Sequence, residues 1–219
     1  RHLWSTDGCV RMRKDNGGYP TVYYATSSME LAMGVQSLLL RLSINARIKQ
    51  VPQVNKGRDQ YHVSVTGQKD LIQFCNEIGA VGYYKSESLS QIKEFLVGKT
   101  ENTNRDVIPH QIWHQYVKPA MQIAGMTHRQ LHNELEMAYS GMTIFKQNVS
   151  RERAMRVAQA VKSEPLELLA KSDIYWDEVV SIEADGVEEV FDLTVPGLHN
   201  FVANNIVVHN SIEQDADVV

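Results

Sequence analysis

The residues with the clearest chemical potential stand near the end of the chain, where His209, Asn210 and Ser211 follow one another. The side-chain amide of Asn210 can attack its own main-chain carbonyl, which closes a five-membered succinimide and breaks the bond to Ser211. His209 can donate a proton to that step, and the Ser211 hydroxyl can carry an acyl group as an ester. The triplet alone also fits an ordinary turn, so the surrounding residues decide between the two interpretations.

The residues before this triplet read as short strands with close turns. Apolar, β-rich runs at 179–183, 190–195, 200–203 and 206–208 are separated by Asp-Gly, Pro-Gly and Asn-Asn pairs. Such pairs accept the backbone conformations of tight turns. The sequence therefore predicts a compact all-β unit that folds the end of the chain inward.

Three runs in this region resemble the C-terminal splicing blocks of inteins: VFDLTV at 190–195, GLHNFVA at 197–203 and VVHNS at 207–211. The resemblance fills every reactive position of those blocks. It implies the C-terminal half of an all-β splicing domain of the Hint type, which works without a cofactor.

The resemblance also implies a role for each reactive residue. Asn210 is expected to cyclise, with His209 as the penultimate histidine and His199 as the second histidine that promotes this step. Asp192 matches the position that couples transesterification to the later steps. Ser211 is expected to be the first residue of the downstream host segment, where it accepts the upstream segment as an ester before an O-to-N acyl shift. Taken alone, His199 also fits a hydrogen-bonded core histidine, and Asp192 a surface carboxylate.

The upstream half of such a splicing domain is expected to lie outside this chain. That half supplies a Cys or Ser at its first residue and a Thr-x-x-His block, and no Thr-x-x-His occurs here. Cys9 is no substitute, because it follows Asp7 and Gly8 inside a different motif. The chain opens on Arg1 without an initiator Met, so we expect a fragment or a processed product. It should cleave at Asn210 at most, and splicing should need the missing intein half in cis or as a partner chain.

The N-terminal stretch reads as two strands and a helix. Strand runs at 9–14 and 21–26 are joined by a hairpin turn at 15–18. Ser27 is expected to begin the helix, with Glu30 completing a capping box. The apolar face of this helix should hold Leu31, Val35, Leu38, Leu39 and Leu42.

The same order of elements then repeats. Strand runs at 45–51 and 60–66 precede a helix from 68 to 78, which stops at Gly79. This helix should bury Leu71, Phe74 and Ile78.

The opening residues LWSTDG at 3–8 resemble the end of a LAGLIDADG motif, and the elements after them fit that family's αββαββα order once an opening helix is granted. The resemblance implies a homing endonuclease repeat. Its acidic residue, here Asp7, would bind Mg²⁺ next to the scissile phosphate of DNA. Lys49 is the candidate for the family's basic residue near the cut. Asp7 also fits a simple turn before Gly8, and Lys49 an ordinary surface lysine.

From residue 88 to about residue 170 the pattern is helical. Pro109 and Pro119 stand at expected helix starts, and Thr127 and Ser150 are expected to cap two further helices. A turn at 138–141 and a short polar helix at 142–148 resemble a helix-turn-helix. That resemblance implies DNA contacts by Thr143, Lys146, Gln147 and Asn148. A plain helical hairpin fits the same spacing.

Charge is divided sharply along the chain. Residues 1–171 hold all 22 Lys and Arg against 15 Asp and Glu, a balance of +7, whereas residues 172–219 hold 11 Asp and Glu and no Lys or Arg. A basic excess in the first part favours contact with double-stranded DNA. The same charge distribution also fits two parts whose charged side chains are simply exposed to solvent. No apolar run is long enough to span a bilayer. Cys9 and Cys75 lack metal-ligand spacing and favour a reducing compartment, so we expect a cytoplasmic protein.

The last residues, SIEQDADVV at 211–219, resemble a segment of bacterial replicative DNA helicases of the DnaB type. The resemblance implies that they belong to a host helicase that the intein interrupts. A phosphate-binding Gly-Lys-Ser/Thr loop does not occur in the sequence, so ATP hydrolysis is not expected of this chain.

Together these patterns predict an α+β protein with four parts. They are a LAGLIDADG repeat at 1–87, a helical DNA-binding extension at 88–171, the C-terminal splicing region at 172–210 and the helicase host segment at 211–219. The predicted function is self-excision by protein splicing, combined with a metal-dependent homing endonuclease. Two alternatives stay open: a DNA-binding module whose ending is incidental, and a relic with an inactive nuclease.

Overall fold

The computed structural model describes residues 1–13, 18–54, 57–99, 105–187, 189, 191 and 193–209. Most of the predicted hairpin turn at 15–18 lies outside these residues, as does the predicted host segment at 211–219. The chain divides into two compact units, Arg1–Asp177 and Glu178–Val219, and each is described by itself. Helices and strands are mixed, which confirms the predicted α+β class.

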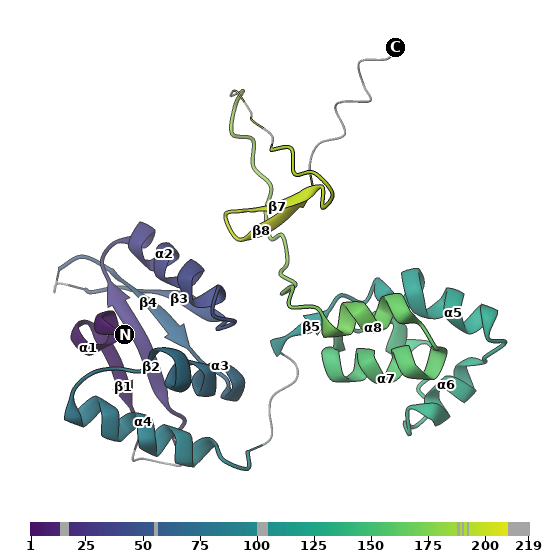
Figure 1. Ribbon diagram of the computed structural model, residues 1–219, viewed down its shortest axis with the longest axis horizontal. Helices are drawn as coiled ribbons and strands as arrows, with labels where there is room; N and C mark the ends of the chain where they lie inside the picture. Colours follow the sequence, from purple (N-terminus) through teal and green to yellow (C-terminus); the bar gives the residue numbers. More distant parts are fainter. Residues whose placement is uncertain are drawn as a thin grey trace. The chain divides into compact units, whose positions relative to one another are not determined.

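The first unit opens with helix α1, His2–Thr6, and an antiparallel sheet of four strands in the order β1-β2-β4-β3 (Figure 1). The register pairs Gly8 with Tyr24, and Val63 with both Tyr24 and Ile48. All four predicted strands are confirmed, with these bounds: β1 Gly8–Arg11, β2 Thr21–Thr26, β3 Ala46–Val51 and β4 Gln60–Val65.

Alternate residues of these strands bury one face of the sheet in what we call the first core. The strand residues in this core are Val10, Val22, Tyr24, Ala46, Val63 and Val65. Helices α2 (Met29–Leu40), α3 (Gln68–Gln73) and α4 (Tyr83–Leu96) contribute the other side chains. Because successive strand side chains point to opposite faces, the residues between them belong to the other face. Those residues include Cys9, Tyr23, Arg47, Lys49, His62 and Ser64.

Two details of the predicted α2 are wrong. The N-cap is Ser28, whose hydroxyl accepts the Leu31 backbone N–H at 3.2 Å, and not Ser27. The buried face consists of Ala32, Val35 and Leu39, while Leu38 is 60% exposed. Leu31 and Leu42 are exposed as well. Small Ala32, which lies three residues before Val35, lets the helix approach the sheet, so the leucine-rich stripe turns toward solvent.

The predicted helix at 68–78 is confirmed. Its first part is α3, and a π-helical turn, η1 (Phe74–Ile78), completes it. Gly79 ends the helix with a φ of +60°, a conformation that favours glycine. Leu71 and Phe74 are fully buried, and Ile78 packs against the first core.

Helix α4 crosses the predicted boundary between residues 87 and 88. Leu89, Ile92 and Leu96 on this helix belong to the first core, and the helix packs against β1. The first core therefore includes residues up to Leu96, because the apolar face of an amphipathic helix packs as one continuous stripe.

A second core occupies the helical part of the first unit. A two-stranded ladder pairs β5, Val107–Ile108, with β6, Val149–Ser150. Trp113, Phe145 and Leu166 are among its buried members. Six helical elements surround it: η3 Trp113–Val117, α5 Lys118–Ile123, α6 His128–Glu134, η4 Thr143–Lys146, α7 Arg151–Val161 and α8 Glu164–Lys171.

The predicted caps in this part are confirmed, but one other prediction is wrong. Thr127 and Gln130 form the capping box of α6, and the Ser150 hydroxyl accepts the Arg153 N–H of α7. Pro119 stands in the first turn of α5, as predicted. The π-helical turn η3 leads directly into α5, because a proline without an N–H is accommodated by a wider turn. The predicted polar helix at 142–148 is only the 3₁₀ turn η4.

The second unit contains a β-hairpin of β7, Asn200–Ala203, and β8, Ile206–His209. Asn204 and Asn205 form the predicted turn, with φ values of +47° and +66°. The predicted strand at 179–183 is absent, although all five residues are described. Val180 is 90% exposed and Ile182 is 92% exposed, so no neighbouring strand buries these side chains in the described part of the chain.

Within the described ranges, every helix is too short or too polar to cross a membrane.

Candidate functional site

The hairpin of the second unit brings the two predicted histidines of the splicing site together. His209 ends β8 and is paired with Asn200, so His199 lies directly beside it. The centroids of the two imidazole rings are 6.4 Å apart, with 23° between the ring planes. His199 has a φ of +53°, and its backbone N–H donates to the Val195 carbonyl at 3.0 Å. The hairpin thus positions both imidazoles next to the point where Asn210 follows in the chain.

Three other predicted splicing residues, Asp192, Asn210 and Ser211, lie outside the described residues. The two histidines are therefore the part of the predicted site whose geometry is known. Two neighbouring imidazoles offer both proton donors and proton acceptors near neutral pH. Such groups suit a cyclisation in which an amide nitrogen loses a proton and a departing amine gains one.

Asp7, the predicted endonuclease acid, lies at the C-terminal end of α1. Its backbone N–H donates to the Leu3 carbonyl at 3.0 Å, and its own carbonyl accepts the Ala25 N–H at 3.3 Å. The exposed carboxylate accepts one hydrogen bond from the Thr6 hydroxyl at 3.2 Å. The backbone is thus fixed to the sheet, while the carboxylate is presented to solvent.

Trp4 and Gly8 hold this helix end against the first core. Trp4 is 3% exposed and makes ring contacts with Tyr24 and Phe74, at centroid distances of 5.9 and 5.1 Å. A Cβ atom on Gly8 would collide with the backbone and ring of Trp4. Glycine is therefore required after Asp7 because the helix and strand approach so closely.

The structure places an unpredicted lysine beside Asp7. The ammonium of Lys85, on α4, donates to the carbonyl oxygens of Trp4, Ser5 and Gly8 at 2.7, 2.9 and 2.8 Å. It thereby satisfies carbonyls at the end of α1 and places a positive charge where the helix dipole is negative. Sequence reasoning missed Lys85 because its partners lie 77 to 81 residues away.

Lys49, the predicted basic residue, is not brought to Asp7. It lies on β3, and its neighbours across the sheet are His62 on β4 and then Ala25 on β2. Strands are about 4.8 Å apart, so roughly 14 Å of sheet separates Lys49 from the strand that follows Asp7. Lys49 instead belongs to the outer face of the sheet.

That outer face carries aromatic and basic groups. The rings of Tyr23 and His62 are stacked, with centroids 4.3 Å apart and 6° between the planes. Burial, and then the positive charge of Lys49, lower the pKa of His62, which favours the neutral imidazole. Burial and the neighbouring Cys9 thiol raise the pKa of Tyr23, against the opposing effect of Arg11. The face therefore combines neutral hydrogen-bonding rings with cations, a mixture suited to DNA.

The described residues contain no group of three or more His, Cys, Asp and Glu side chains that could hold a metal ion. Asp7 offers an exposed carboxylate, and carboxylate oxygen is a preferred ligand of Mg²⁺. Because Mg²⁺ usually retains water and binds substrate phosphates, one carboxylate fits as a single protein ligand of a site that DNA completes.

The four predicted DNA contacts of the helical part lie together on and after η4. All four are exposed: Thr143, Lys146, Gln147 and Asn148. Ile144 and Phe145, which lie between Thr143 and Lys146, are buried. The Asn148 side-chain oxygen accepts the His110 backbone N–H at 3.0 Å, so this oxygen supports the loop. The side chains of the other three are directed away from the second core.

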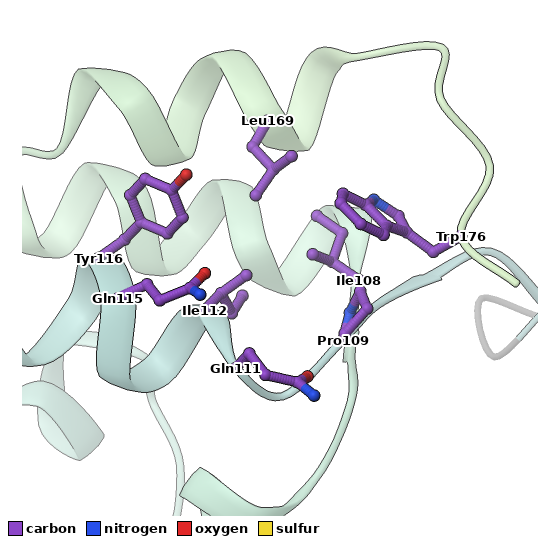
Figure 2. Close-up of a pocket in the computed structure, with 8 residues that line it drawn as sticks. All are labelled: Ile108, Pro109, Gln111, Ile112, Gln115, Tyr116, Leu169 and Trp176. Carbon is purple, nitrogen blue, oxygen red and sulfur yellow. The ribbon is translucent and has the colours of Figure 1, made fainter. Parts of the chain in front are cut away.

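A cavity of about 330 Å³ lies elsewhere on the helical part (Figure 2). None of the predicted site residues lines it. Its walls are mostly apolar, with Trp176 on one side and Tyr116 on the other, and they carry no carboxylate, histidine or lysine. The cavity therefore lacks the groups that either predicted reaction requires.

Comparisons with known proteins agree with both predicted families. The intein splicing domain family matches residues 42–210, and the LAGLIDADG-like domain family matches residues 1–79. Replicative DNA helicase DnaB of Rhodothermus marinus is 60% identical over all 219 residues, which make up 23% of its length. The corresponding helicase of Nostoc sp. is 59% identical over 219 residues, or 25% of its length. Replication factor C small subunit of Thermococcus kodakarensis is 46% identical over 46 residues, 20% of this chain and 5% of that protein. The chain spans about a quarter of the length of the two helicases.

Proposed function

From the premise that this chain belongs to the intein splicing domain family and carries a LAGLIDADG-like domain, we propose specific roles for its residues. The chain is part of an intein with a homing endonuclease region. In the proposed splicing step, the Asn210 amide nitrogen attacks the Asn210 carbonyl carbon. The bond to Ser211 then breaks, and the Ser211 amine leaves with a proton. The observation that supports this role most directly is the hairpin that places His199 beside His209.

The two histidines have complementary roles in this proposal. His209 donates the proton that the departing Ser211 amine requires, and His199 accepts the proton that the attacking amide loses. The Ser211 hydroxyl has by then accepted the upstream segment as an ester, which afterwards moves to the freed amine. Asp192 couples the two stages. No metal or cofactor takes part in these steps.

A cleavage experiment tests this role. The full chain, alone and mixed with the upstream intein half of a matching helicase, is incubated at pH 7, and mass spectrometry follows release of residues 211–219. We expect release from the unaltered chain and none from Asn210→Ala, while Asn76→Ala, at an exposed asparagine of the first unit, is the control for general damage. Intact mass in every mixture would contradict the splicing role.

The second unit also supports the proposal that other strands complete it. Val180, Ile182, Val187 and Phe191 are exposed, although alternating apolar residues normally pack between strands. We propose that the upstream intein half provides the missing sheet neighbours. Amide hydrogen exchange at 178–187 should then slow when this half is added, and unchanged exchange would contradict the proposal.

We further propose that the first unit cuts double-stranded DNA at the uninterrupted helicase gene. Asp7 would bind Mg²⁺, and the ion when bound supplies an activated water and stabilises charge on the phosphate. The chain's own contribution is to hold the Asp7 backbone through α1 and Lys85, and to receive DNA on the outer face of the sheet. The relation of all 219 residues to DnaB proteins supports a replicative helicase as host.

A nicking assay with Mg²⁺ tests the nuclease role. We expect Asp7→Asn to lose activity on DNA that carries the uninterrupted helicase gene, while Glu87→Gln, a change at an exposed α4 carboxylate, retains it. Equal activity of the unaltered chain and Asp7→Asn would remove Asp7 from the reaction.

A further inference from the structure

Two segments of the helical part of the first unit lack carboxylates, although Glu134 and Glu136 lie between them and Asp106 pairs with Arg151. Residues 107–133 and 137–151 contain no Asp or Glu. The same two segments contain Lys118, Arg129, Lys146 and Arg151, together with four of the eight histidines of the chain. A surface that lacks negative charge attracts a polyanion more strongly than one with interspersed acids.

Lys118 and His114 form a pair on this surface, one helical turn apart. The Lys118 ammonium donates to Nδ1 of His114 at 3.3 Å and lies 5.4 Å from the ring centroid of Phe145. The salt bridges of the described residues do not include Lys118. A neutral ring and an aromatic face therefore hold the ammonium, and its positive charge is not compensated by a carboxylate.

This geometry also assigns the proton on the imidazole. Because Nδ1 accepts from Lys118, the ring proton of neutral His114 belongs on Nε2. His114 is exposed, so Nε2–H is available as a donor. The Lys118 ammonium retains two further N–H groups. The pair thus offers three donors and one full positive charge, with no acceptor directed outward, which suits a phosphate oxygen.

Phe145 connects this pair to the predicted base contacts. Its buried ring also makes edge contacts with Trp113 and His128, at centroid distances of 5.1 and 4.9 Å. The Trp113 indole N–H in turn donates to the Gln147 carbonyl at 3.1 Å. The pair and the η4 turn are therefore held by one set of aromatic contacts.

We propose that Lys118 and His114 together bind one backbone phosphate of duplex DNA, next to the exposed side chains of Thr143, Lys146 and Gln147. This assignment rests on the proposed action of the first unit on double-stranded DNA, and it adds the helical part to the DNA contact. It divides the surface into a pair that contacts the backbone independently of sequence and a turn that faces base edges.

Salt-dependent binding of the full chain tests the pair. Fluorescence anisotropy with two unrelated 30-base-pair duplexes, at several KCl concentrations and without divalent metal, gives Kd and its salt dependence. Lys118→Met keeps the aliphatic stem over Phe145 and removes the charge. We expect the magnitude of the slope of log binding constant against log salt concentration to fall by about 0.9, the value for one phosphate contact. Kd should rise by the same factor on both duplexes.

Two further variants complete the design. Lys171→Met is the matched control, because the Lys171 ammonium already pairs with Glu167, and its slope should stay that of the unaltered chain. His114→Ala should weaken binding on both duplexes, and the double variant should bind no more weakly than Lys118→Met. Thermal unfolding followed by circular dichroism checks that each variant is folded.

The possible results separate the two proposals. DNA binding with an unchanged slope in Lys118→Met, or additive losses in the double variant, overturns the phosphate pair alone. Failure of the unaltered chain to bind either duplex overturns the DNA-binding function and the pair with it.

Discussion

The sheet of the first unit and the hairpin of the second unit are both antiparallel, yet they are stabilised in opposite ways. The four-stranded sheet is covered on one face by α2, α3 and α4, and its alternate residues are buried. The hairpin β7-β8 leaves Val202, Ile206 and Val207 exposed within its own unit. A fully buried aliphatic side chain contributes about 1.5–3 kcal/mol. The first unit therefore contains its own core, whereas the splicing hairpin orders its two histidines mainly through register and turn.

This difference indicates which substitutions should impair each proposed function. The position of Asp7, the proposed endonuclease acid, depends on contacts between residues some 80 positions apart, such as Lys85 with Trp4. The proposed splicing pair depends on residues within one hairpin, because His199 and His209 are connected by the turn at Asn204 and Asn205. Core changes should affect the nuclease, and hairpin changes should affect splicing.

The largest expected effect is on the splicing side. His199→Ala should slow cleavage after Asn210 by about 10²- to 10⁴-fold, the usual contribution of a positioned acid or base. Urea unfolding of the first unit should not change, because its core does not contain His199. Time courses of peptide release by mass spectrometry measure the rate. An unchanged rate would show that the imidazole pair is only structural.

A core change should produce the reverse result. Phe74→Ala removes a fully buried ring that contacts Trp4 and should lower the free energy of unfolding of the first unit by about 3–5 kcal/mol. DNA nicking should be lost, while release of residues 211–219 in the presence of the upstream half continues. Urea titration and the release assay measure the two outcomes. Loss of both activities together would contradict the proposal that nicking and peptide release depend on separate units.

Lys85→Met should have a smaller effect on stability and a selective effect on the nuclease. It leaves the carbonyls of Trp4, Ser5 and Gly8 without their ammonium donor, at a cost of about 1–3 kcal/mol. Nicking should fall more than the folded fraction does, because Asp7 lies between these carbonyls. Lys69→Met, at an exposed position on α3, is the control. Equal losses in the two variants would argue against a positioning role for Lys85.

The smallest expected effect concerns pH. Burial and Lys49 lower the pKa of His62 in the folded protein below its unfolded value. The unfolded chain therefore binds the proton first as pH falls, and folding stability decreases from the unfolded pKa, about 6.5, down through the lower folded pKa. His62→Gln should show less loss of stability between pH 7.5 and pH 5. Urea midpoints at the two pH values measure the difference, and identical losses would contradict it.

Much of the fold was predictable because local patterns agree with the final packing. The four strands of the sheet, the helix that ends at Gly79 and the caps at Thr127 and Ser150 follow from alternation, periodicity and short polar contacts. Predictions were wrong where two patterns competed. Leu38 continues a leucine-rich stripe, but the sheet packs against Ala32 instead. The run at 179–183 is strand-like in composition and has no neighbour that pairs with it in the described part of its unit.

The sequence by itself determined the proposed reacting groups, because cyclisation and cleavage involve adjacent residues such as His209, Asn210 and Ser211. It likewise placed Asp7 before a glycine at the end of a helix. Only the tertiary structure decided which other groups stand beside them. Lys85 reaches the end of α1 across the first core, and Lys118 is held by Phe145 from another segment. Such contacts depend on how packed elements bring distant residues together, which no local pattern in the chain specifies.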